Sequence, residues 1–417
     1  MTNRRVVVTG IGAITPIGNN LNDYWDSLIK GESGAAPITL FDATHFKTNF
    51  ACEVKGFVPT DFIDRKEARK LDRFCQFAVV VADQAFSDSG LVIEKINSDR
   101  AGVIWGSGIG GMDTFYTECV AYGTGSGTPR FNPFFIPKLI SDIPAGHISI
   151  KYGFRGPNFT TVSACASSSN ALIDAYNYIK WNKADLFIAG GSEACVKEPG
   201  IGGFNAMMAL STRNDDPKTA SRPFDKDRDG FVLGEGGGAL VLEEYEHAKK
   251  RGAKIYAELV GGGMTADAHH ITAPHPEGLG AKNVMKRAIE DAAINTSEID
   301  YINVHGTSTP LGDIAETKAI QDLFGEHSYQ LNISSTKSMT GHLLGAAGVV
   351  ESIACIMSVK NNIIPPTINH FERDEKIDPR LNLTFNEAQE KQINYSLSNT
   401  FGFGGHNAST LFKKFIE

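Results

Sequence analysis

Three residues in this chain, one cysteine and two histidines, stand in settings that suit covalent catalysis. Cys165 follows the apolar segment 159–162, at the point where a helix is predicted to begin. A helix N-terminus carries partial positive charge and unpaired N–H groups, and both favour an ionised thiol. We therefore expect Cys165 to be a nucleophile whose pKa lies below the usual value of about 8.5.

His305 follows the apolar run 302–304 and begins a loop rich in glycine and threonine. Loops at strand ends are where α/β proteins often place catalytic residues. His342 lies five positions after Lys337 and precedes a segment of small residues. Each histidine alone is equally consistent with a hydrogen-bonded core residue, but together with Cys165 they indicate a catalytic group.

Other catalytic patterns are missing from the sequence. It contains no H-E-x-x-H, C-x-x-C or G-x-S-x-G motif, and Thr15 stands where a dinucleotide fingerprint needs its third glycine. The segment 341–345 lacks the lysine of a phosphate loop. The six cysteines, at 52, 75, 119, 165, 195 and 355, are typical of independent thiols in a reducing compartment.

Short β-type runs alternate with helical patterns along the whole chain. Strands are predicted at 6–9, 102–105, 186–189, 238–242, 257–260, 302–304 and 409–413, with helical patterns at 78–86, 171–179 and 284–292. This alternation predicts an α/β fold in which helices cover mixed sheets.

The chain divides into two comparable parts without a long linker. The charged segment 243–250 places the junction near residue 252, giving parts 1–252 and 253–417. The segments 161–170 and 334–348 both predict a strand, a turn and a helix opening rich in small residues. A duplicated αβ unit, with those two helices packed closely at a pseudo-twofold axis, would bring Cys165 and His342 together.

The bulk composition is that of an ordinary soluble protein. The 417 residues are 41% hydrophobic and 21% charged, with a net charge of -8, which argues against a general nucleic-acid binder. The opening Arg4-Arg5 and apolar stretch superficially suggest a signal peptide, but Gly10, Gly12 and Pro16 interrupt it. Since no run of about 18 uncharged apolar residues suits a membrane helix, we expect a cytoplasmic protein.

Four motifs, in order, resemble the elongating β-ketoacyl-acyl-carrier-protein synthases. They are VSACASS around Cys165, NVHGTSTPLGD around His305, STKSMTGHLLGAAG with Lys337 and His342, and FGFGGHN at 401–407. The similarity runs from Val6 to Leu411, and the segment 211–236 resembles the bacterial type II form. The resemblance implies a homodimer with the thiolase-like fold, a duplicated αβαβα layered sandwich with mixed five-stranded sheets. The first half would carry the cysteine and the second half the two histidines.

The resemblance also implies the reaction, a decarboxylative Claisen condensation that elongates fatty acids by two carbons. Cys165 would take an acyl chain from acyl carrier protein, and malonyl carrier protein would then lose CO2 and attack that chain. No cofactor is required, because phosphopantetheine arrives on the carrier protein. Neutral His305 and His342 would stabilise the developing charge, and the backbone N–H groups of Cys165 and Phe403 would form the oxyanion hole.

Further roles follow from the same resemblance. Lys337 is expected to pair with Glu316 and to keep the histidines oriented and uncharged. Phe403 and the segment 267–272 are expected to form a movable gate. The phosphopantetheine and the acyl chain are assigned to Thr307, Thr309, Thr272, Ile109 and Phe135. Asn303, Glu351, Ser398 and Asn399 match positions that hold a monovalent cation, Na+ or K+, in some relatives.

A basic stripe is predicted to bind the acidic carrier protein. Its members recur at helical spacing and are Arg65, Lys66, Arg69, Lys70 and Arg73. Arg130 is a further expected contact, whereas Met208 replaces a basic residue that relatives often have. The interspersed Asp64, Glu67 and Asp72 are also consistent with an ordinary solvated face.

Several related classes can be compared with the sequence. A non-catalytic chain-length partner lacks the nucleophile, and a thiolase needs a second cysteine near the C-terminus, yet none follows Cys355. His342 disfavours a Cys-His-Asn initiation enzyme. A ketosynthase of a polyketide or aryl-polyene pathway has the same mechanism and stays open as an alternative, as do the chain length and unsaturation of the substrate.

Overall fold

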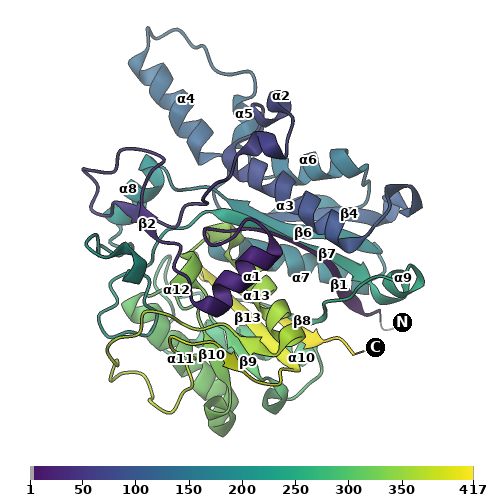
Figure 1. The fold of residues 1–417 in the computed structure, drawn as a ribbon, viewed down its shortest axis with the longest axis vertical. Coiled ribbons are helices and arrows are strands. Elements are labelled where there is room, and N and C mark those ends of the chain that lie inside the picture. Colours follow the sequence, from purple (N-terminus) through teal and green to yellow (C-terminus); the bar gives the residue numbers. More distant parts are fainter. Residues whose placement is uncertain (1–3, 417) are drawn as a thin grey trace.

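The computed structural model describes residues 4–416, and its centre is a ten-stranded sheet to which both parts of the chain contribute (Figure 1). The strand order is β10-β9-β13-β14-β8-β1-β7-β6-β4-β5. The first five strands in the chain's order are β1 Val6–Ile14, β4 Ala101–Gly106, β5 Asn158–Thr161, β6 Leu186–Glu193 and β7 Gly236–Glu244. The others are β8 Ala257–Ala266, β9 Tyr301–Asn303, β10 Asn332–Ser334, β13 Tyr395–Gly402 and β14 His406–Lys414.

The two halves of this sheet have the same arrangement. In the first half β4 lies parallel between β5 and β6, and β7 and β1 follow as antiparallel neighbours. In the second half β9 lies parallel between β10 and β13, followed by antiparallel β14 and β8. The predicted duplication is confirmed, with one addition. The two five-stranded units are joined edge to edge, because β1 pairs with β8 and Val6 lies opposite Leu259.

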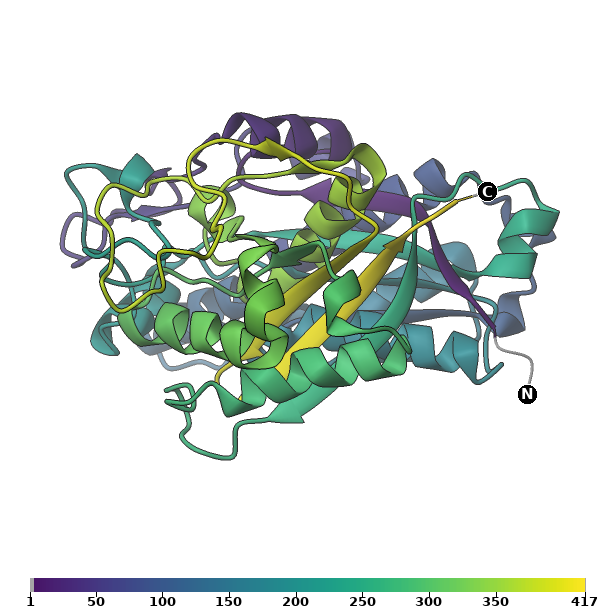
Figure 2. The same cartoon turned by 90° about the horizontal axis from the view of Figure 1, so that it is seen from below.

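Helices form the layers on either side of the strands. The outer layers are α3 (Arg73–Ser89) and α6 (Ile143–Tyr152) on the first half, and α10 (Leu279–Asp291) and α11 (Pro310–Phe324) on the second. The green helices α10 and α11 lie outside the yellow strands β13 and β14 in Figure 2. The central layer is α7 (Ser167–Lys180) and α13 (Ala347–Asn361), which contact each other and strands of both halves.

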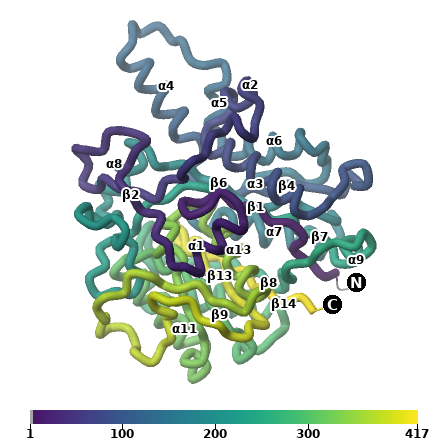
Figure 3. Tube along the Cα trace, viewed as in Figure 1, coloured from purple at the N-terminus to yellow at the C-terminus, as the bar shows by residue number. Residues whose placement is uncertain are grey.

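The remaining helices lie outside these layers. They are α1 (Leu21–Lys30), α2 (Arg65–Ala68), α4 (Met112–Thr124), α5 (Phe135–Leu139), α8 (Glu198–Ala206), α9 (Tyr245–Lys250) and α12 (Lys337–Thr340). Two-stranded sheets are formed by β2 (Ala36–Pro37) with β3 (Phe50–Ala51), and by β11 (Ile363–Ile364) with β12 (Gln389–Glu390). The α4 helix and the loop after it project from the body of the molecule (Figure 3).

Small residues allow the two central helices to touch. A Cβ atom at Gly348 would lie 2.0 Å from the Ser169 Oγ, and the Val349 N–H donates to Ser168 Oγ at 3.0 Å. The helix-propensity cost of Gly348 is therefore offset by close packing of α13 on α7. The segment Leu344–Asn361 is long and apolar enough to cross a membrane, but 89% of it is buried within the protein, as is usual for a core helix.

Gly348→Ala should lower the free energy of unfolding by about 1–3 kcal/mol, because the added methyl group overpacks the contact between α7 and α13. Gly146→Ala is a matched control within α6, where no atom lies within 4 Å of the new Cβ. That control should be neutral or stabilising by up to about 1 kcal/mol. Urea denaturation of both variants checks the prediction, and equal stability of the two would contradict it.

Candidate active site

Cys165 lies in a strained turn between β5 and α7. The turn is the 3-10 segment Ala164–Ala166, and Ala164 has a φ of 50°, a left-handed conformation that non-glycine residues rarely adopt. Leu344 has a φ of 48° in the matching turn before α13. Backbone strain of this kind persists where the surrounding structure imposes it, and it is concentrated at functional sites. The two turns meet at the pseudo-twofold axis, as the sequence predicted for Cys165 and His342.

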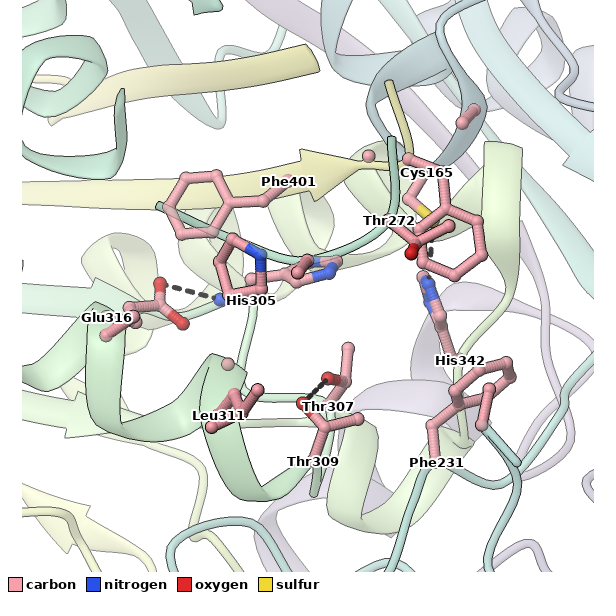
Figure 4. Close-up of a pocket in the computed structure, with 18 of the residues that line it drawn as sticks. Cys165, Phe231, Thr272, His305, Thr307, Thr309, Leu311, Glu316, His342 and Phe401 are labelled. Carbon is pink, nitrogen blue, oxygen red and sulfur yellow. Dashed lines mark hydrogen bonds between the residues drawn. The ribbon is translucent and has the colours of Figure 1, made fainter. Parts of the chain in front are cut away.

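His342 is the nearest functional group to the thiol. Its Nε2 lies 2.9 Å from Cys165 Sγ (Figure 4). The backbone of His342 is held on both sides, since its N–H donates to the Val232 carbonyl at 2.8 Å and its carbonyl accepts from the Gly234 N–H at 2.9 Å. Phe231 packs edge-on against the ring, with 5.3 Å between centroids. The segment 211–236, which the sequence connected only with the family, therefore positions the His342 imidazole beside the thiol.

His305 completes the group from the end of β9. Its ring lies perpendicular to that of His342, with centroids 5.3 Å apart. The backbone N–H groups of His305 and Gly306 each donate to the Glu316 carboxylate at 2.9 Å. Because Glu316 belongs to α11, a helix of the outer layer fixes the loop that carries His305.

Lys337 is buried close to the histidines, but its partner differs from the predicted one. The ammonium group forms a salt bridge with Glu351 of α13, and both side chains are almost fully buried. The predicted pairing with Glu316 is wrong, because that carboxylate accepts the main-chain bonds described above and a further bond from the Asn399 amide at 3.2 Å. Lys337 thus connects α12 with the central helix rather than with α11.

The histidines are neutral in this environment, as expected. Burial, together with the positive charge of Lys337, pushes the pKa of His305 and of His342 well below the ordinary value. Burial also raises the pKa of Glu316 and of Glu351 to about 7 each. A buried cation beside two imidazoles therefore keeps both available as neutral hydrogen-bonding groups.

The expectation of a lowered thiol pKa is wrong for the resting site. Burial raises the pKa of Cys165 to about 12, although Lys337 and the backbone N–H of Phe403 act in the opposite direction. Desolvation therefore outweighs these two opposing effects. The resting pair is therefore a neutral thiol in contact with a neutral imidazole.

A cavity of about 480 Å³ opens above the thiol and brings together most of the predicted residues. Its walls contain Cys165, His305, His342, Thr307, Thr309, Thr272, Ile109, Glu316 and Phe403. Phe135 does not line it, because this side chain stacks with Phe115 and Phe131, at centroid distances of 6.4 and 5.3 Å. The two threonine hydroxyls at 307 and 309 lie 3.1 Å apart and face the cavity (Figure 4).

The two predicted gate segments are hydrogen-bonded to each other. The Gly404 N–H donates to the Ile271 carbonyl at 2.7 Å, and the Asp267 N–H donates to the Gly405 carbonyl at 2.9 Å. The Asn407 amide also donates to the Asp267 carboxylate at 2.8 Å. Asp267 and Asn407 were missed as individual residues, although both lie within or next to segments singled out in the sequence.

The basic stripe is not a single helical face. The α2 helix contains only Arg65–Ala68, and Arg73 begins α3 with its guanidinium turned inward to Glu235, at 2.6 and 2.9 Å. Lys66, Arg69 and Arg130 are exposed, and Lys70 pairs with Glu67 at 2.7 Å. The predicted stripe is therefore wrong for Arg73, while the remaining members stay candidates for docking.

Residues 3–248 match the model of the β-ketoacyl synthase N-terminal domain, and residues 256–371 match the model of the C-terminal domain. The chain therefore belongs to the β-ketoacyl synthase family and is an acyltransferase, which confirms the prediction from its motifs.

Relatives of known name cover the whole chain. A 3-oxoacyl-[acyl-carrier-protein] synthase 2 of Synechocystis sp. is 49% identical over 414 residues, 99% of this chain and 98% of the relative. The structure of the ishigamide ketosynthase/chain length factor has a TM-score of 0.92 at 34% identity, covering 100% of both chains. A type II polyketide synthase acyl-carrier protein in complex with its ketosynthase gives 0.88 at 32% identity and covers 100% of both chains.

The neutral resting pair predicts how Cys165 alkylation depends on pH. In a Cys119→Ser background, which removes the exposed thiol, the rate of iodoacetamide addition to Cys165 should rise continuously between about pH 6 and 9. The reason is that a raised thiol pKa leaves the reactive thiolate fraction growing about tenfold per pH unit in this range. Peptide mass spectrometry measures the rate, and a plateau reached below about pH 7 would show a stable thiolate instead.

Proposed function

We propose that this protein is a type II 3-oxoacyl-[acyl-carrier-protein] synthase that condenses malonyl-ACP with an acyl chain bound to Cys165. The supporting observation is the 2.9 Å contact between Cys165 Sγ and His342 Nε2 beneath a cavity that also exposes His305. We assign the nucleophile to residues 1–252 and the two histidines to residues 253–417, since each of these parts contributes five strands of the sheet.

Acyl transfer begins at the neutral thiol–imidazole pair. As Sγ attacks the acyl thioester carbonyl, the thiol proton passes to the His342 Nε2. The carrier's phosphopantetheine thiolate then leaves and takes up that same proton from His342, which becomes neutral again. The products are the Cys165 thioester and a free carrier thiol, so no external acid or base is consumed. The backbone N–H groups of Cys165 and Phe403 are the proposed donors to the carbonyl oxygen, which becomes negatively charged during the attack.

Condensation uses the same imidazoles as donors. When malonyl-ACP loses CO2, negative charge develops on its thioester oxygen, and neutral His305 and His342 can each donate an N–H to that oxygen. The enolate carbon then attacks the Cys165 thioester and forms the new C–C bond. The C–S bond breaks, and the cysteine leaves as a thiolate that takes up one proton from solvent, which restores the neutral thiol. Imidazoles that were already cationic would bind the malonyl carboxylate and oppose its loss, so the lowered pKa of both histidines suits this step.

Lys337, Glu316 and Glu351 are proposed to position the imidazoles rather than to react. The monovalent cation site also remains a proposal. Asn303 Oδ1, Glu351 Oε2 and Ser398 Oγ are buried oxygens that lack a hydrogen-bond partner among residues 4–416, which suits Na+ or K+. Asn399 is a weaker candidate ligand, because its Oδ1 already accepts from the Ser409 hydroxyl at 2.7 Å. A bound cation would neutralise part of the carboxylate charge beneath the histidines.

The substrate is proposed to enter past the Phe403 gate as a carrier-bound thioester. Thr307 and Thr309 would bond the phosphopantetheine arm, with Thr272 on the opposite loop, while Ile109 would contact the acyl chain. Lys66, Arg69, Lys70 and Arg130 are proposed to dock the acidic carrier, and the ketosynthase–carrier complex among the similar structures supports this kind of partner.

A second copy of the chain is proposed to cover the projecting region formed by α4, the loop after it and α5. Several large apolar side chains there are at least 40% exposed, namely Phe115, Val120, Tyr122, Phe131, Phe134 and Ile136. Val162, next to the edge strand β5, is 62% exposed. Exposed apolar surface of this kind is typical of an oligomer interface, which supports the proposed homodimer. The free cysteines support a reducing compartment, the cytoplasm.

A ketosynthase of a polyketide or aryl-polyene pathway is the second candidate. The solved structures described above favour it at 32–34% identity, whereas the 49% identity to the Synechocystis protein favours fatty-acid elongation. Incubation with malonyl-ACP and a series of acyl-ACPs, with mass analysis of the products, separates the two candidates. Transfer of saturated chains followed by a single two-carbon extension supports the first.

Cys165→Ala should abolish formation of the acyl-enzyme, because the other cysteines do not line the cavity. Intact mass spectrometry after incubation with acyl-ACP should show the acyl adduct on the wild-type chain and none on the variant. Cys195→Ala, which removes a buried thiol outside the cavity, is the matched control and should keep the adduct. An adduct of the same mass on Cys165→Ala would falsify the assignment.

His305→Ala and His342→Ala should each slow malonyl decarboxylation at least about a hundredfold, because each removes a donor to the developing enolate. His305→Ala should still accept the acyl chain, since His342 remains beside the thiol. His370→Ala is the control, because His370 stacks on Phe385 away from the cavity. Release of labelled CO2 is the measurement, and wild-type rates in either active-site variant would refute the assigned roles.

A further inference from the structure

Glu193 is a buried carboxylate that the reaction described above does not use. It ends β6 and is fully buried, and no lysine, arginine or histidine of residues 4–416 forms a salt bridge with it. Five hydrogen-bond donors surround it instead. Oε2 accepts from the backbone N–H groups of Gly108 at 2.7 Å and Gly345 at 3.0 Å. Oε1 accepts from the Ser107 hydroxyl at 3.0 Å and from the backbone N–H groups of Ile109 at 3.2 Å and Gly110 at 3.3 Å.

These donors suit a charged carboxylate. Burial raises the pKa of Glu193, and the surrounding N–H groups counter that effect. Four of its five partners are backbone N–H groups, which can only donate, and only the Ser107 hydroxyl could also accept, so the arrangement favours the ionised carboxylate. The backbone donors replace the counter-ion that a buried charge otherwise needs.

The duplication of the fold explains why a set of N–H groups exists at this place. Leu186 of β6 pairs with Ala101, the first residue of β4, and Ser396 of β13 pairs with Tyr301, the first residue of β9. If these two pairs are taken as equivalent, Leu186 corresponds to Ser396. Seven residues further along the chain in each half, Glu193 then corresponds to Phe403. Gly345 likewise follows Leu344 as Cys165 follows Ala164, the two residues with matching left-handed turns.

The second half therefore contains a counterpart of the proposed oxyanion hole. In the first half, the N–H of Cys165 would receive the substrate's oxygen. In the second half, the N–H of Gly345 receives an oxygen of the Glu193 side chain at 3.0 Å. The Glu193 carboxylate therefore occupies this site itself.

The donors that Glu193 binds carry parts of the active cavity. Gly108 and Ile109 line it from the loop after β4, and Leu344, directly before Gly345, lines it from the second half. The two backbones are too close for side chains between them, because a Cβ atom at Gly345 would lie 2.3 Å from the Gly108 nitrogen and 2.6 Å from the Glu193 Oε2. The Ile109 side chain belongs to none of the hydrophobic core clusters. The hydrogen bond from its backbone N–H to Glu193 is therefore one of the main contacts that hold Ile109 in place.

We propose that Glu193 is a positioning residue that fixes the Ile109 wall of the acyl cavity against the turn after His342, and thereby sets which acyl chain lengths are accepted. The proposal rests on the proposed function, in which Cys165 carries an acyl chain along this wall. In Glu193→Gln, one oxygen becomes an NH2 group that faces N–H donors. Either the loop 108–110 or the Gly345 turn must then move away, whichever way the amide is oriented.

The test compares the kcat/KM of Cys165 acylation for a short and a long saturated acyl-ACP. In Glu193→Gln, transfer of the long chain should fall about tenfold more than transfer of the short chain, because only the long chain depends on the wall beyond the thiol. Ser107→Ala removes one bond to the same carboxylate and should shift the ratio in the same direction by about threefold. Glu243→Gln changes another buried carboxylate, bound by Arg251 away from the cavity, and should lower thermal stability while keeping the wild-type ratio.

The possible results distinguish failure of the Glu193 positioning role from failure of the proposed synthase function. If the wild-type chain accepts no acyl group, the proposed function fails. If the wild type is acylated and folded Glu193→Gln keeps its long-to-short ratio, the positioning role is refuted. Should Glu193→Gln not fold, Ser107→Ala decides alone, and an unchanged ratio in that variant overturns the proposal.

Discussion

Burial of an uncharged thiol against an uncharged imidazole is the constraint around which this structure is arranged. Sγ of Cys165 and Nε2 of His342 approach to 2.9 Å from opposite halves of the chain. Such an approach requires two helices to converge on one point, which in turn requires the glycine and serine contacts between α7 and α13. The buried Lys337–Glu351 pair does not line the cavity, and the charge of Lys337 adds to burial in keeping both imidazoles neutral.

The architecture and the cluster formed by one cysteine and two histidines were predictable because they rest on local patterns and on short motifs. Cys165, His305 and His342 each sit beside a strand end or a helix of small residues, and duplication of the unit could be inferred from 161–170 and 334–348. The pairing of buried side chains could not be predicted from the sequence in the same way. The partner of Lys337 depends on whether α11 or α13 lies nearer, and no spacing in the sequence contains that information.

The errors share a physical cause, which is that burial is a property of the assembled fold. Desolvation raises the pKa of the buried Cys165 thiol, and the position of a cysteine along the sequence does not show how deeply it will be buried. Arg73 has the spacing of a surface residue, but the segment after Ala68 turns and directs its guanidinium to Glu235. Glu193 was overlooked for the same reason, since a single acidic residue at a strand end looks like a solvated terminus.

The pairing of β1 with both β7 and β8 has a consequence for how the chain folds during synthesis. During synthesis β1 emerges long before its partners, which lie more than two hundred residues later, at Gly236–Glu244 and Ala257–Ala266. Until then its unpaired N–H and C=O groups form an exposed strand edge, the feature that most readily recruits other chains. The seam that unites the halves in the finished molecule is therefore the place where the nascent chain most needs protection from aggregation.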